Sequence, residues 1–131
     1  MEVTSHDERR LKLELRLAQL QKNETCQKQF LSFVKTIWPS FIQGRHHEII
    51  AEKLERVASG KLKRLIINMA PRHTKSEFAS FLFPAWMMGK NPNMKIIQAT
   101  HTTELAVNFG RKVKNLLDTE EFREVFPDVK L

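Results

Sequence analysis

Apolar side chains recur at helical spacing in three stretches of the first half of the chain. Residues 7–22 carry two stripes of leucines with Arg, Lys and Glu between them, which predicts a charged amphipathic helix. The segment 23–25 breaks this pattern with capping residues, so a second helix is expected to begin there and to end before Pro39. A third helix is expected to run to about Ala58, where Ser59-Gly60 supplies a glycine stop.

Two short apolar runs in the second half are typical of buried strands. They are Leu65–Ile67, which is followed by a turn at Pro71, and Met94–Ala99. Between them, apolar residues recur from Phe78 onward at the spacing of one helix face, and Pro84 is expected to kink or end the first half of that helix. A strand, helix, strand succession predicts a right-handed parallel crossover. The pattern therefore indicates an α/β fold.

The chain after the second predicted strand is expected to be helical again. Apolar residues line one face up to Leu117, and either Thr102 or Thr103 can cap the start of this helix. Thr119 is expected to cap a last short turn that ends at Pro127. Ligands of open α/β sheets lie at the carboxyl ends of the strands, so the segment at Thr102 is either part of a ligand site or a plain helix cap.

The loop between the first predicted strand and the next helix holds the candidate site. Lys75 and Ser76 fall in the first turn of that helix, where unpaired N–H groups and the positive end of the dipole favour anions. In a P-loop, such a lysine reaches the outer phosphates and the hydroxyl binds magnesium. The two glycines of G-x-x-x-x-G-K-[ST] fall here at Met69 and Thr74, so Thr74 must tolerate a conformation that glycine adopts easily. The alternative is a basic loop that only caps a core helix.

Three separated blocks of the sequence resemble the ATPase domain of phage terminase large subunits, which package viral DNA. MAPRHTKSE, with the leader that begins FIQGRHHEII, resembles the variant Walker A of that family, and FPAWMMGKNPNMKIIQATHTTELA and EEFREVFPDVKL follow in the family's order. The resemblance covers residues 30–131. It implies a partial P-loop NTPase (RecA/ASCE-like) core with parallel strands and N-terminal helices. We therefore expect an amphipathic helix over residues 1–24 and a partial ATPase domain over residues 25–131.

The resemblance also implies roles for individual residues. Arg72 and Lys75 would act on the phosphates of ATP, and Ser76 would bind Mg²⁺ through the nucleotide. Gln43 and His47 would line the adenine pocket; alternatively, this stretch is core and the start of the next helix. The full set implied to bind the nucleotide is Gln43, His47, Arg72, His73, Thr74, Lys75 and Ser76. The implied partners are double-stranded viral DNA, a portal protein, a small terminase subunit and a homo-oligomeric ring.

The distribution of charge adds a second candidate function. The chain of 131 residues has a formal net charge of +7, and Glu77 is the only acid between Arg56 and Thr103. Such a basic region favours phosphates of nucleotides or of nucleic acid. A basic α/β module that binds nucleic acid without hydrolysing nucleotide is therefore the alternative. A solvated basic surface is the plain explanation.

Bulk properties narrow the remaining possibilities. Cys26 is alone, so it cannot form an internal disulfide and is expected to be a packed thiol. No apolar run approaches the roughly 20 residues that cross a bilayer, so we expect no membrane contact and a cytoplasmic location, which the resemblance makes the host cytoplasm. No apolar run between Ile97 and residue 131 ends in the paired acids of a Walker B element. The resemblance implies that those acids, and a nuclease domain after them, lie further along the intact protein. We therefore expect this chain to hydrolyse ATP at a rate near background, or to be an inactive remnant.

Overall fold

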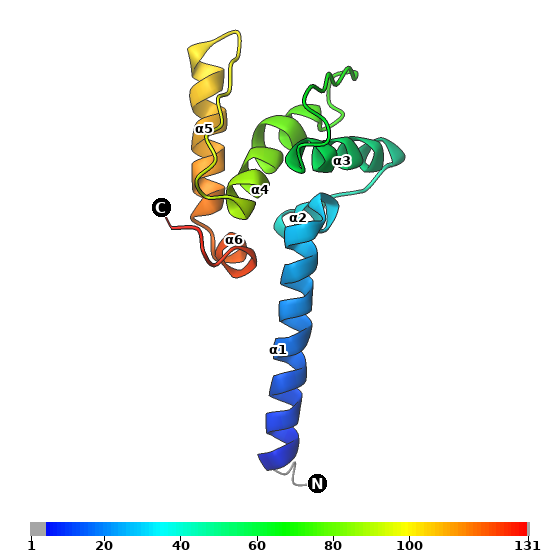
Figure 1. The fold of residues 1–131 in the computed structure, drawn as a ribbon, viewed down its shortest axis with the longest axis vertical. Coiled ribbons are helices and arrows are strands. Elements are labelled where there is room, and N and C mark those ends of the chain that lie inside the picture. Colours follow the sequence, from blue (N-terminus) through cyan, green and yellow to red (C-terminus); the bar gives the residue numbers. More distant parts are fainter. Residues whose placement is uncertain (1–4, 131) are drawn as a thin grey trace.

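The structure, a computed structural model, describes residues 5–130 and is built from helices. Helix makes up 66% of the chain, and no strand occurs among the described residues, so the predicted α/β core with parallel strands is wrong. The elements are α1 (Ser5–Lys28), α2 (Phe30–Ile37), α3 (Arg45–Ala58), the π-helix η1 (Glu77–Leu82), α4 (Phe83–Lys90), α5 (Thr103–Leu117) and α6 (Glu120–Val125) (Figure 1).

The two predicted strands are not strands, since the described residues contain no sheet. Leu65 and Ile67 pack against the core, whereas Ile66 between them is 86% exposed, so the alternation typical of a strand is present. The first segment lines a groove with α3, and the segment around Ile97, itself 95% exposed, lines a groove with α4 and α5. Figure 1 shows the second segment beside α5. A ladder requires a neighbouring strand, and the apolar runs alone did not determine what lies beside them.

The first helix continues through the predicted break at 23–25. Asn23 does not cap a new helix, because its Nδ2 donates to the carbonyl of Glu124 at 2.8 Å. Thr25 Oγ1 donates back to Gln21 O at 2.9 Å, a bond that a helix interior accommodates. The break comes instead at Gln29, whose backbone is extended at φ −118° and ψ 119°. The predicted boundary between residues 24 and 25 therefore lies within α1.

Most of α1 stands away from the rest of the molecule (Figure 1). Its only buried residue is Cys26, at 1% exposure, which confirms the packed thiol. Five leucines of the helix are between 52% and 71% exposed, namely Leu11, Leu13, Leu15, Leu17 and Leu20. At about 100° per residue, the two leucine stripes lie on opposite sides of the helix.

An aromatic core joins the end of α1 to the helices around the candidate loop. Phe30 is fully buried, and its ring centroid lies 5.4 Å from that of Phe78, 5.8 Å from that of Phe83 and 5.5 Å from that of Trp86. Trp86 Nε1 donates to the carbonyl of Cys26 at 2.9 Å. These contacts fix η1 and α4, which follow the candidate loop, against the N-terminal helices.

The predicted kink at Pro84 takes the form of a π-helix followed by α4. The N–H of Phe83 donates to Phe78 O, the wider spacing of a π-turn. Pro84 has no N–H, so the carbonyl of Ser80 lacks its usual helical donor. Gln98 Nε2 donates to Ser80 O at 2.6 Å in its place. The second extended segment is thereby attached to the helix that the proline distorts.

Two sequence signals at helix ends are confirmed. Gly60 has a φ of +75° just after α3, as expected for a glycine stop. Thr102 caps α5, because its Oγ1 accepts from the N–H of Leu105 at 3.3 Å. The plain-cap interpretation of Thr102 therefore has a direct structural basis.

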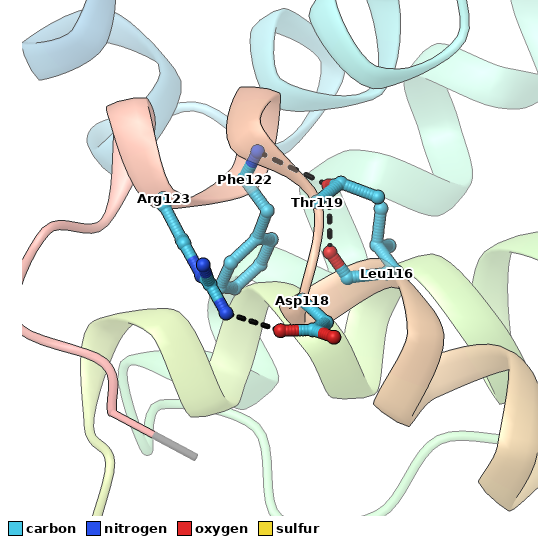
Figure 2. Close-up of polar contacts among 5 residues, drawn as sticks. All are labelled: Leu116, Asp118, Thr119, Phe122 and Arg123. Atoms are coloured by element: carbon cyan, nitrogen blue, oxygen red, sulfur yellow. Dashed lines mark hydrogen bonds and ion pairs between the residues drawn. The ribbon is translucent and has the colours of Figure 1, made fainter.

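The last short helix is also capped as expected (Figure 2). Thr119 Oγ1 accepts from the N–H of Phe122 at 3.3 Å and donates to Leu116 O at 2.7 Å. Arg123 pairs with Asp118 across the same turn. The turn is short because the Thr119 hydroxyl bonds to the last turn of α5 and to the first turn of α6.

Candidate phosphate-binding loop

Residues 71–76 form a tight loop that leads from an extended segment into a helix. Lys75 and Ser76 are the first helical residues, and the N–H of Phe78 donates to Thr74 O at 2.9 Å to close the first turn. The prediction that Lys75 and Ser76 lie in the first turn is therefore confirmed. The segment before the loop was predicted to be a strand, but it belongs to no sheet.

The backbone of this loop alternates in the sign of φ. Arg72 has a φ of +64° and Thr74 a φ of +58°, whereas His73 between them is not in the positive range and Lys75 is helical. Alternation between right- and left-handed residues favours a backbone that turns successive N–H groups toward one side, the arrangement called a nest. Thr74 tolerates the left-handed conformation, as the sequence required. It does so at the position where the standard pattern has glycine.

The charged and hydroxyl side chains of the loop differ in how many hydrogen bonds they make. Lys75 folds back over the loop, with Nζ donating to Met69 O at 3.3 Å. Arg72 is exposed and makes no hydrogen bond or ion pair within residues 5–130. The hydroxyl of Ser76 makes no cap bond at the start of η1. His73 is exposed, and its Nδ1 lies 2.9 Å from Pro71 O.

His47, from the first turn of α3, reaches the loop and has both ring nitrogens engaged. Nδ1 accepts from the N–H of Gly44 at 2.9 Å, and Nε2 lies 2.6 Å from Thr74 Oγ1. The Thr74 hydroxyl donates to His73 O at 2.7 Å, so it accepts from His47 Nε2–H. Sequence reasoning did not find this link, because no local pattern relates two residues so far apart in the chain.

The surroundings of His47 favour its neutral form. The residue is 5% exposed, and its ring lies between those of Phe41 and Phe78, at centroid distances of 4.7 and 5.1 Å. Burial lowers the pKa of His47 from its ordinary value near 6.5, and the charges of His46 and His73 lower it further. A neutral ring with Nε2–H is also the tautomer that both hydrogen bonds require.

The two residues implied to contact adenine, Gln43 and His47, differ in whether they have a free hydrogen-bonding atom. Gln43 Nε2 donates to Glu48 Oε1, while Gln43 Oε1 is buried and has no partner among the described residues. His47 would have to give up one of its two bonds to meet a base. The alternative core role also has support, because Trp38 and Phe41 pack against the hydrophobic core.

A groove lies beside the loop, between α3 and the extended segment. It has a volume of about 280 Å³, and its walls include His46, Lys53 and Asn68 with apolar residues of both segments. A groove of about 690 Å³ lies elsewhere, between the end of α2, η1 and α5, and is spanned by the pair Glu77–Lys112. Neither groove is lined by residues 71–76.

Over residues 5–130, no group of three or more His, Cys, Asp or Glu side chains is placed to hold a metal ion. A magnesium ion brought by ATP needs only a hydroxyl from the protein and phosphate oxygens, and Ser76 can supply the hydroxyl. In the same part of the chain, none of the helices has the length and apolar character needed to span a bilayer.

Comparison of the chain with known protein families, with curated proteins and with solved structures found no match. The terminase resemblance therefore stays a prediction from the three sequence blocks.

Proposed function

We propose that this chain binds the phosphates of ATP, with Mg²⁺, at the loop Arg72–Ser76, as the Walker A part of a terminase-like DNA-packaging motor. The observation that carries the proposal is the alternation of φ from Arg72 to Lys75 directly before a helix start. Such alternation favours a concave arrangement of N–H groups, which needs no neighbouring strand. The dipole of the helix that follows favours an anion at the same place.

The side chains of the loop suit the same ligand. Lys75 needs only to leave Met69 O to reach the β and γ phosphates, and Ser76 would coordinate the magnesium ion. Arg72 is exposed and would switch between the γ phosphate and a neighbouring subunit, as the resemblance implies. Arginine suits both contacts, since its charge persists and its planar fork fits phosphate oxygens. In the intact motor, the proposed partners are double-stranded viral DNA, a portal protein, a small terminase subunit and further copies in a ring, in the host cytoplasm.

Titration calorimetry with Mg-ATP tests the proposal. Wild type is expected to bind, and Lys75→Ala to weaken binding at least tenfold, on the order of one charge-assisted hydrogen bond. Lys63→Ala is the matched control, because it removes an exposed lysine outside the loop and should leave affinity unchanged. Equal affinities of all three proteins would refute phosphate binding at this loop.

Nucleic-acid binding is a second candidate that one observation favours. Arg56, Lys61, Lys63 and Arg64 are all exposed around the end of α3. A DNA duplex bound there should lose affinity steeply between two salt concentrations, and binding should survive Lys75→Ala because many phosphates share the contact. Salt-independent binding, or its loss in Lys75→Ala alone, would contradict this candidate.

A further inference from the structure

We propose that His47 is a positioning residue of the loop: its hydrogen bond to Thr74 holds the left-handed backbone at a place where other phosphate loops use glycine. The inference rests on the proposed phosphate binding and concerns what keeps that site formed. It assigns His47 a role different from contact with adenine.

The need for a positioning residue comes from the backbone of Thr74. Its φ of +58° is unfavourable for a residue with a branched Cβ. Such a conformation persists only when the surrounding structure holds it. Glycine would adopt it without strain, so a threonine there requires an external restraint.

His47 can provide that restraint because it is itself fixed at three points. Gly44 N–H holds Nδ1 at 2.9 Å, and the rings of Phe41 and Phe78 enclose the imidazole. The remaining nitrogen, Nε2, is left 2.6 Å from Thr74 Oγ1. Phe78 belongs to η1, the helix that follows the loop, so His47 packs on both α3 and η1. The lowered pKa of His47 keeps the ring neutral near pH 7, which these bonds require.

The hydroxyl of Thr74 passes the restraint to the loop backbone. Oγ1 donates to His73 O at 2.7 Å, the carbonyl between the two residues of positive φ. A single buried imidazole thereby fixes both the side chain of Thr74 and the peptide before it. We expect that removing either end of the His47–Thr74 bond lets the loop leave the nest conformation.

The test is a double-mutant cycle on Mg-ATP affinity. His47→Leu removes both hydrogen bonds but keeps an apolar side chain, and it should weaken binding roughly five- to thirty-fold, the cost of one residue strained in the left-handed region. In a Thr74→Gly background the same substitution should change affinity less than about twofold, because glycine needs no restraint. An equal loss in both backgrounds would overturn the positioning role and leave His47 as a packing or adenine-contact residue.

A substitution at Thr74 keeps the proposal testable if His47→Leu does not fold. Thr74→Val removes the hydroxyl and keeps the branched Cβ, so it should lose affinity as His47→Leu does. An affinity of Thr74→Val equal to that of wild type would refute the role of this hydrogen bond.

Hydrogen exchange of the loop amides separates failure of the inference from failure of the proposed function. Without nucleotide, amides of residues 72–76 should exchange faster in Thr74→Val than in wild type. If neither wild type nor any variant, including Thr74→Gly, binds Mg-ATP, the proposed function is refuted. The hydrogen-exchange rates of the loop amides then decide by themselves whether His47 positions the loop. Unchanged exchange in Thr74→Val would overturn it.

Discussion

Replacement of Trp86 by phenylalanine tests the packing that holds the helix after the candidate loop. Trp86 is fully buried, and its Nε1 donates to Cys26 O at 2.9 Å inside the core. Phenylalanine would leave that carbonyl without a donor, at a cost of about 1–3 kcal/mol. The lost ring carbons add about 1.5 kcal/mol at roughly 0.8 kcal/mol per buried carbon. The free energy of unfolding should therefore fall by about 2.5–4.5 kcal/mol.

Trp38→Phe is the matched control in the same chain. Trp38 is partly buried, and its Nε1 donates at 2.8 Å to the hydroxyl of Ser40, which water can replace. The loss should stay below about 1 kcal/mol. Urea unfolding followed by far-ultraviolet circular dichroism measures both variants. Equal losses, or a Trp86→Phe variant as stable as wild type, would refute the buried position of Trp86 and the core built around it.

Three further predictions concern α1, a helix cap and His47. Leu17→Lys on the protruding helix should change the free energy of unfolding by less than about 0.5 kcal/mol in urea unfolding, because the side chain is 57% exposed. Thr102→Ala should lower the free energy of unfolding by about 1 kcal/mol, whereas Thr103→Ala should lower it little, since Thr102 and not Thr103 accepts from a helix N–H. A Thr103→Ala variant that melts at a lower temperature than Thr102→Ala would contradict the cap. Folding lowers the pKa of His47, so the neutral side chain contributes its full stability above about pH 6.5 and progressively less as pH falls below that value. His47→Gln should flatten this part of the plot of unfolding free energy against pH. A wild-type plot no steeper than that of the variant would contradict the prediction.

Helices were predictable here because their signals are local. The glycine stop at Gly60, the cap at Thr119 and the apolar face from Phe78 onward each depend on residues within a few positions, and the structure has all three. The break at 23–25 failed for a non-local reason, because Asn23 bonds to a carbonyl near the other end of the chain. Capping residues indicate a helix end only when no distant partner takes their side chains.

The sheet could not be decided from the sequence because pairing is a relation between segments. Ile66 and Ile97 lie in apolar runs typical of strands, yet neither residue belongs to a strand in the structure. The Gln98 side chain is bonded to Ser80 of a helix, which places the second extended segment beside helices. The candidate loop was predicted better than the sheet, since short-range spacing places Lys75 and Ser76 at the helix start and Thr74 at the strained position. Its link to His47 had no local signal.

The central claim is that the amides from His73 to Ser76 form an anion site. The most direct measurement is a titration of the isotope-labelled chain with Mg-ATP, followed by the backbone amide resonances in heteronuclear NMR. We expect the largest shifts on residues 73–76, and Lys75→Ala should reduce them at equal nucleotide concentration. Shifts that are absent from this loop, or that centre on the basic end of α3, would contradict it.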